Sequence, residues 1–167
     1  MCAVALTAAA CGGAANTGDV RVAAGEELGA AGAHAVGTDA AVAPTDTLVV
    51  YKTPTCGCCN DWVDHVKENG FAVVTQDLND LTETKRQLRV PAGRFSCHTA
   101  TVRGYTIEGH VPADLIHRLI SENPRGARGL AVPGMPMGSP GMEGLFKQDY
   151  EVLLFDDDGN VQVYAER

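Results

Sequence analysis

Thr53-Pro54-Thr55-Cys56-Gly57-Cys58-Cys59-Asn60-Asp61-Trp62 contains three of the six cysteines of the 167-residue chain. An apolar, β-branched run at residues 47–52 precedes this segment and predicts a strand. The apolar positions that follow recur at helical spacing and predict a helix over residues 58–68, with an inner face made of Cys59, Trp62, Val63 and Val66. The cysteines are therefore expected at a turn from a strand into a helix.

Cysteines at the beginning of a helix are expected to be reactive or to bind a metal. The first backbone N–H groups of a helix have no partner within it, and the helix dipole favours negative charge at this end. Thiols placed there ionise more readily than a free cysteine does. Cys56 and Cys59 are three residues apart and share one face of the helix, whereas Cys58 projects elsewhere from the same turn.

The rest of the chain alternates between strand and helix patterns. We predict a strand at 71–76, a helix at 80–88, strands at 98–102 and 106–108, a helix from Pro112, an irregular Pro/Gly-rich segment at 124–144, and a hairpin of residues 150–155 and 161–164. This order of elements is that of a thioredoxin-like α/β domain. The predicted fold is a thioredoxin-like central sheet with flanking helices, extended by a Pro/Gly/Met-rich loop and a C-terminal β-hairpin.

Cys97 lies far from the other three cysteines in sequence, but a thioredoxin-like layout brings the loop before the third strand beside the first helix. Three interpretations remain open. The first is an interaction domain stabilised by Cys56–Cys59 and Cys58–Cys97 disulfides. The second is a thiol-disulfide oxidoreductase that uses Cys56 and Cys59. The third is a soft-metal site of Cys56, Cys58, Cys59 and Cys97, and we favour it because it uses all four thiols.

Copper suits this predicted site better than zinc does. Zinc prefers two ligand pairs held in tetrahedral geometry. Three ligands crowded on one turn suit thiolate-bridged Cu(I) better. Additional thioether ligands are available in residues 133–142, which contain Met135, Met137 and Met142. The alternative is that these methionines fill gaps beneath a coil.

Two histidines are candidates for further metal ligands. His110 lies in a Gly-flanked turn before a helix, where it could approach the cysteines. His98 directly follows Cys97. If Cys97 faces the site from a strand, His98 faces away from it, because successive side chains in a strand point to opposite sides. We therefore expect His110 to be the better ligand.

Four motifs occur in order within residues 47–166. They are Cys56-Gly57-Cys58-Cys59 with Trp62, Ser96-Cys97-His98-Thr99-Ala100, Glu108-Gly109-His110-Val111-Pro112-Ala113, and Gly134-Met135-Pro136 with Gly138-Ser139-Pro140-Gly141-Met142. Together they resemble the CopG family, exported thioredoxin-like bacterial proteins associated with copper resistance. The resemblance implies a copper site on the four cysteines, which can hold one copper ion or a polynuclear cluster. It also implies a role in interconverting Cu(I) and Cu(II). Copper ions and other copper-handling proteins are then the expected partners, and the choice between a copper oxidoreductase, a store and a chaperone stays open.

Charge and composition restrict the remaining classes of partner. The formal net charge is −8, and the chain has no cluster of basic residues. Nucleic acid is therefore not an expected partner, because binding its phosphates needs concentrated Lys and Arg. After the N-terminus, no apolar run approaches the length of a membrane span.

The N-terminal residues predict export. Residues 1–11 have the length of a signal-peptide apolar region, and Ala8-Ala9-Ala10-Cys11-Gly12-Gly13 is similar to a bacterial lipoprotein signal in which Cys11 would be lipidated. Residues 12–46 predict a flexible Ala/Gly-rich linker, followed by a metal-binding domain at 47–167. We expect an extracytoplasmic protein, in the periplasm or on the outer face of the membrane, that contacts the membrane only through a lipid anchor. An Ala-rich disordered tail is the alternative.

Overall fold

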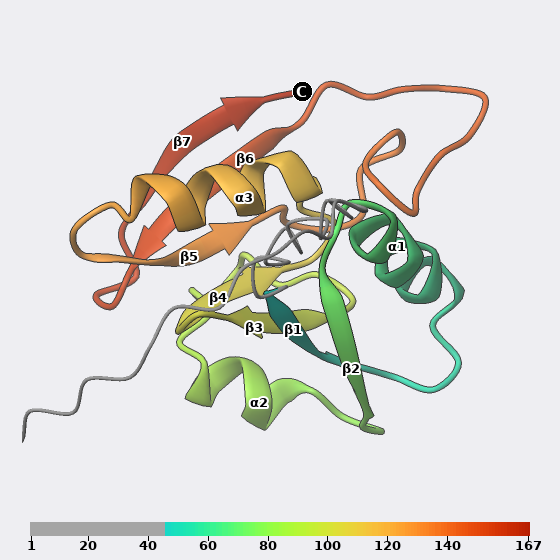
Figure 1. Cartoon of the computed structure of the whole chain (residues 1–167), viewed down its shortest axis with the longest axis horizontal. Coiled ribbons are helices and arrows are strands. Elements are labelled where there is room, and N and C mark those ends of the chain that lie inside the picture. The colour runs from blue at the N-terminus through green and yellow to red at the C-terminus, as the bar shows by residue number, and fades with distance from the viewer. Residues whose placement is uncertain (1–45) are drawn as a thin grey trace, which may run out of the picture. The chain divides into compact units, whose positions relative to one another are not determined.

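The computed structural model describes residues 46–167. Its elements in chain order are β1 (Thr47–Lys52), α1 (Gly57–Glu68), β2 (Ala72–Asp77), α2 (Thr82–Gln87), β3 (Thr99–Val102), β4 (Tyr105–Glu108), α3 (Ala113–Glu122), β5 (Ala127–Ala131), β6 (Glu151–Asp156) and β7 (Val161–Glu166). The strands form one mixed sheet in the order β2-β1-β3-β4-β5-β6-β7 (Figure 1). The predicted mixed α/β fold is confirmed, and its first seven elements follow the predicted order.

The strand β1 and the helix α1 form because their apolar residues repeat with the periods of those elements. On β1, Leu48 and Val50 are fully buried and alternate with more exposed positions. On α1, the predicted inner face is buried: Cys59, Trp62, Val63 and Val66. Trp62 has no exposed surface, and its indole N–H donates to the carbonyl oxygen of Val111 at 2.9 Å. This bond ties α1 to the segment that leads into α3.

The helices cover opposite faces of the sheet. The helices α1 and α3 lie on one face, and α2 lies on the other (Figure 1). The paired residues Ala100 and Ile107 belong to the apolar core on the face of α1 and α3. The neighbouring pair, Thr99 and Glu108, is also buried but is contacted by Lys85 of α2. The face beneath α2 therefore carries buried polar groups close to the edge of the sheet.

The segment at 124–144 is not irregular throughout, so that part of the prediction is wrong. Residues 127–131 form β5, which pairs in parallel with β4 and buries Leu130 in the core. Gly129 obscured this strand in the sequence, because glycine weakens strand patterns. In the structure, a Cβ at Gly129 would collide with the carbonyl oxygen of Thr106 on β4. Close backbone approach to β4 is therefore the reason for glycine at this position.

The C-terminal hairpin is confirmed. The strands β6 and β7 pair in antiparallel fashion and extend the sheet beyond β5. None of the helices within residues 46–167 has both the length and the apolar character needed to cross a bilayer. The division of the chain into 1–11, 12–46 and 47–167 stays a prediction, because residues 1–45, including Cys11, lie outside the described part.

Gly129→Ala is expected to lower the free energy of unfolding by about 3 kcal/mol, because the added methyl group forces β5 away from the β4 backbone. Gly57→Ala is the matched control: it lies in the first turn of α1, and a Cβ there meets no described atom within 4 Å. That control should gain about 0.5 kcal/mol, because alanine has less backbone freedom to lose on folding. Urea unfolding of both variants measures the difference. Equal stability of the two would contradict the assigned contact between β4 and β5.

Candidate metal centre

Four cysteine sulfurs meet where the turn after β1 approaches the turn before β3. The Sγ atom of Cys97 lies 3.4 Å from that of Cys59 and 3.9 Å from that of Cys58. The Sγ atoms of Cys56 and Cys58 are 3.6 Å apart. All four sulfurs lie within 4.8 Å of one another. The structure thus brings Cys97 to the other three cysteines, as the sequence predicts.

The cysteines differ in oxidation state. Cys56 and Cys59 form a disulfide, with their Cα atoms 5.3 Å apart. Within the described part of the chain, Cys58 and Cys97 are the free thiols. The predicted first disulfide is therefore present, and the predicted second one, Cys58–Cys97, is not. Two thiols remain in contact with a disulfide.

The beginning of α1 determines how three of the sulfurs are presented. Cys56 is the N-cap residue, and its N–H donates to the carbonyl oxygen of Thr53 at 3.2 Å. Its side chain makes no capping hydrogen bond, and the first turn of α1 contains no acidic residue. The partial positive charge of the first-turn N–H groups is therefore available to the sulfurs themselves.

His110 lies beside Cys97, with one ring nitrogen next to the sulfur. Its Nε2 atom lies 3.0 Å from Cys97 Sγ, and its Nδ1 atom lies 2.8 Å from the carbonyl oxygen of Pro140. A carbonyl only accepts hydrogen bonds, so Nδ1 carries the proton and the lone pair of Nε2 faces the sulfur. Burial lowers the pKa of His110, which keeps the ring neutral. A backbone carbonyl that orients one ring nitrogen while the other binds is the usual arrangement around metal-bound histidine.

His98 also faces the cluster, so the expectation that it points away is wrong. Its Nδ1 atom lies 3.3 Å from Cys97 Sγ. The strand β3 begins only at Thr99, so the alternation of side chains that the prediction assumed does not apply to Cys97 and His98. The adjacency of cysteine and histidine was the available sequence signal, and strand periodicity obscured it.

The buried ring of His98 is incompletely paired. Burial lowers its pKa well below the ordinary value, and the neighbouring His110 acts in the same direction. Among residues 46–167, its Nε2 atom has no hydrogen-bond partner. Its face packs against Trp62, with ring centroids 4.4 Å apart. Cys97, His98 and His110 therefore form a second group of metal-binding atom types that shares Cys97 with the sulfur cluster.

Cys97 is a protonated thiol in this state of the protein. Burial raises its pKa to about 12, and the neighbouring Cys58 adds to the shift. Its S–H can donate to the Nε2 lone pair of His110, which is consistent with the short contact between them. A metal that binds Cys97 must displace this proton, so binding becomes more favourable as the pH rises.

The Met-containing loop between β5 and β6 passes beside the N-terminal end of α1 (Figure 1). It reaches the cluster through Pro140, which binds His110, and through Gly141, which packs against the α1 backbone. Met135 is half-exposed, and Met137 and Met142 are partly buried. The loop thus closes over the cluster, while ligand roles for these three methionines stay a prediction.

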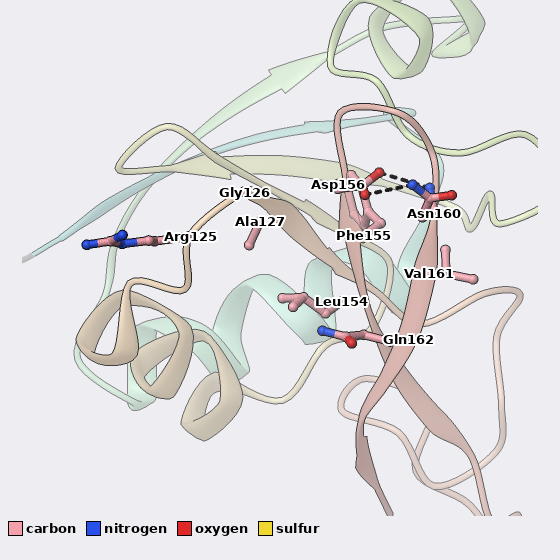
Figure 2. Close-up of a pocket in the computed structure, with 9 residues that line it drawn as sticks. All are labelled: Arg125, Gly126, Ala127, Leu154, Phe155, Asp156, Asn160, Val161 and Gln162. Carbon is pink, nitrogen blue, oxygen red and sulfur yellow. Dashed lines mark hydrogen bonds between the residues drawn. The ribbon is translucent and has the colours of Figure 1, made fainter.

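A separate pocket lies at the opposite end of the sheet. Its volume is about 250 Å³, and its lining residues are Arg125, Gly126, Ala127, Leu154, Phe155, Asp156, Asn160, Val161 and Gln162 (Figure 2). These residues come from the beginning of β5, the end of β6 and the beginning of β7. The cysteines are not among them, so this pocket is separate from the candidate metal centre.

Comparison with known proteins identifies one family and two solved structures. Residues 95–142 match a family described as "Protein of unknown function, DUF411". Structures titled "Copper resistance protein copG- Form 2" and "Copper resistance protein copG- Form 1" are 40% and 41% identical in sequence to this chain, with TM-scores of 0.70 and 0.68. The matches cover 74% and 72% of this chain and 98% and 96% of the solved chains. The curated proteins contain no match.

Gly141→Ala is expected to displace the Met-containing loop from the cysteines. The added Cβ would lie 2.6 Å from the carbonyl oxygen of Cys58 and 2.7 Å from the amide nitrogen of Trp62. Alkylation of Cys58 by iodoacetamide, followed by mass spectrometry, should become about tenfold faster, which corresponds to opening that is about 1.4 kcal/mol easier.

Gly134→Ala is the matched control for this experiment. Gly134 has a φ of +69°, close to the +80° of Gly141, so alanine is similarly strained at both positions. A Cβ at Gly134 meets no described atom within 4 Å. Equal acceleration in both variants would show that loop strain, and not contact with α1, controls access to Cys58.

Proposed function

This chain belongs to the CopG family of copper resistance proteins, and from this premise we propose that it binds copper through the thiolates of Cys56, Cys58, Cys59 and Cys97. The observation that carries the proposal is the convergence of the four sulfurs, with the nearest contact from Cys97 to the α1 cysteines at 3.4 Å. Thiolates are soft donors, which select Cu(I), Zn(II) or the iron of iron–sulfur clusters. The two related solved structures are titled copper resistance proteins, which supports the same metal.

The donor set fits copper better than zinc. Three of the cysteines crowd one end of α1, which favours sulfurs shared between metal ions over the two separate ligand pairs of a tetrahedral zinc site. His110 directs an Nε2 lone pair toward Cys97, and His98 adds a buried neutral imidazole. Imidazole binds copper well in both oxidation states. The four cysteines and two histidines form two sets of possible ligands that have Cys97 in common. This number of donors supports the binding of more than one copper ion.

The copper-binding state requires chemical reduction of the Cys56–Cys59 disulfide. An external thiol reductant, itself oxidised to a disulfide, would supply the two electrons and two protons that convert the Cys56–Cys59 disulfide into two thiols, and these thiols would lose their protons when a metal binds. Copper supplies one-electron chemistry when bound, by changing between Cu(I) and Cu(II). The residues of the chain bury Cys59 and both histidines, hold His110 in one tautomer, and keep the donors close together. We infer a role in copper resistance and homeostasis, with copper ions as the primary partner and redox conversion of copper as the finer function.

A thiol-disulfide oxidoreductase is the second candidate function. The Cys56–Cys59 disulfide at the N-terminus of α1 favours it, because Cys56 is partly exposed and Cys59 is fully buried. An incoming thiolate would attack Cys56 Sγ, break the disulfide, and release Cys59 as a thiolate. This reaction leaves Cys58, Cys97 and both histidines without a role, so copper binding explains more of the site.

We also propose that the protein is extracytoplasmic and is anchored through a lipid on Cys11. The support is in the sequence: small residues flank Cys11, and the segment before it has the length of a signal-peptide apolar region. An anchored site of this kind would meet copper before the metal reaches the cytoplasm. Other copper-handling proteins on the same side of the membrane would be its exchange partners.

Anaerobic titration with Cu(I) tests the copper proposal. The reduced protein is expected to bind more than one copper ion per chain, because four thiols and two imidazoles are available to share. Changing Cys56, Cys58, Cys59 and Cys97 together to Ser should abolish tight binding. The control variant replaces Cys2 and Cys11 with Ser, and it should bind as much copper as the unaltered chain does.

The same protein samples separate the two candidate functions. Full copper binding by the variant without the four cysteines would refute the copper proposal. Rapid insulin reduction by the metal-free protein, lost in Cys56→Ser and Cys59→Ser but retained in Cys58→Ser and Cys97→Ser, would favour the oxidoreductase.

Radiolabelled fatty acid supplied to expressing bacterial cells tests the lipid anchor. The label is expected on the unaltered chain and not on Cys11→Ser, because lipoprotein processing attaches the lipid to that sulfur. Cys2→Ser, which leaves Cys11 in place, should stay labelled. An unlabelled wild-type chain would rule out lipidation, and the copper proposal would stand unaffected.

A further inference from the structure

A buried carboxylate lies next to the candidate metal centre on the face of the sheet that α2 covers. Glu108 has no exposed surface, and it forms an ion pair with Lys85, whose side chain is 7% exposed. Lys85 Nζ donates to Glu108 Oε1 at 2.6 Å and to Thr99 Oγ at 2.9 Å. No local sequence pattern indicates this pair, because the two residues lie 23 positions apart in different elements.

Glu108 binds both ends of the short segment that carries Cys97 and His98. Its Oε1 atom accepts the backbone N–H of Ser96 at 2.6 Å, and its Oε2 atom accepts the hydroxyl of Thr99 at 2.6 Å. Ser96 and Thr99 are the residues immediately before and after Cys97 and His98. One carboxylate therefore determines where this sulfur and this imidazole lie relative to β4.

The same region of β4 also positions His110. Gly109, which follows Glu108, donates its N–H to the carbonyl oxygen of His98 at 3.0 Å. Gly109 has a φ of +72°, and a Cβ there would collide with Ser96, so this glycine permits close packing of the two turns. Ser96 also donates its hydroxyl to the carbonyl oxygen of Gly134 in the Met-containing loop. The bonds around Glu108 thus connect the turns that present Cys97, His98 and His110 with the loop that covers them.

Stability alone does not explain a buried ion pair at this position. Desolvating two charges opposes their attraction, and apolar residues of similar volume often replace such pairs with no loss of stability. A buried and fully bonded carboxylate does, however, impose a specific geometry on its donors, because each lost bond leaves a buried polar group unpaired. The geometry imposed here is that of the segment between Ser96 and Thr99.

We propose that Glu108 and Lys85 are positioning residues of the metal centre, which hold Cys97 and His98 at binding distance from the cysteines of α1. Lys85 balances the charge of Glu108, and Glu108 holds the turn. This inference rests on the proposed function, because copper binding is what the positioning of Cys97 and His98 would serve. The positioning itself concerns the metal-free protein and can be measured without copper.

Two changes separate positioning from stability. Glu108→Gln keeps the shape of the side chain but presents N–H groups or a weaker acceptor to the three donors. The double change Lys85→Met with Glu108→Leu removes both charges and retains apolar volume, so the domain should stay folded while the turn loses its anchor. Thr99→Val is a milder third variant, because it removes the two hydrogen bonds of the Thr99 hydroxyl, to Glu108 and from Lys85, but leaves the Lys85–Glu108 ion pair in place.

The first measurement uses the reduced, metal-free protein. Hydrogen exchange of the Ser96 amide should become about tenfold faster in Glu108→Gln and in the double variant, because its charge-assisted hydrogen bond is lost. Alkylation of Cys97 should accelerate relative to that of Cys58. Thr99→Val should show smaller changes in the same direction. Wild-type exchange and alkylation in all three variants would overturn the proposal, whether or not the protein binds copper.

The second measurement is anaerobic Cu(I) titration, followed by the ultraviolet absorption of the copper-thiolate bonds. We expect the three variants to bind copper with altered absorption, and the first two about tenfold more weakly. Leu154→Ala is the stability control, because this core residue of β6 lines the separate pocket and is not among the residues of the candidate metal centre. It should melt at a lower temperature and retain the wild-type copper absorption.

The outcomes distinguish this inference from the proposed function. A wild-type protein that binds no copper refutes the proposed function, and the Ser96 and Cys97 measurements still decide whether Glu108 holds the turn. Altered exchange with wild-type copper absorption and affinity would overturn the role in the metal centre. An equal loss of copper absorption in Leu154→Ala would assign the effect to general destabilisation and would also overturn it.

Discussion

The antiparallel pairing of β1 with β3 is the constraint on which the site depends. Pairing Tyr51 with Thr99 brings the end of β1 and the beginning of β3 to the same edge of the sheet. The turn into α1 and the turn that carries Cys97 must therefore meet there. The strands β4 and β5 end at this edge as well, because β4 runs antiparallel to β3 and β5 runs parallel to β4. One strand arrangement thus assembles the cysteines, both histidines and the covering loop.

The surroundings of these groups change their chemistry. Trp62 closes the apolar side of the cluster and packs against His98, while the loop at Pro140 and Gly141 covers the other side. Burial keeps both imidazoles neutral and the thiol of Cys97 protonated. Neutral imidazoles are the form that binds metals, whereas the thiol must lose its proton. The same desolvation therefore keeps the histidines in the form that can bind a metal, and it would make the proposed metal binding at Cys97 dependent on pH.

The proposed metal binding would compete with disulfide formation for the same sulfur atoms. Cys56 and Cys59 cannot both form a disulfide and serve as thiolate ligands, so the oxidation state of this pair controls how many sulfur donors are available. What distinguishes the site from a simple dithiol motif is the contribution of the second turn. Cys97 and the histidines beside it have no part in a two-cysteine exchange reaction, yet they account for half of the convergent side chains around the cluster.

Local patterns in the sequence determined the strand-to-helix cysteine turn, the buried face of α1 and the hairpin of β6 and β7, because these depend on neighbours close in the chain. Cys97 was predictable at the cluster only through the expected fold. The strand β5, the orientation of His98 and the pairing of Glu108 with Lys85 were decided by tertiary structure. Gly129 lies against Thr106 of the neighbouring strand, and the carboxylate of Glu108 binds both α2 and the Cys97 turn. His98 faces the cluster because β3 begins only at Thr99. Sequence periodicity reports which residues are buried, but only the packed strands determine which buried polar groups meet.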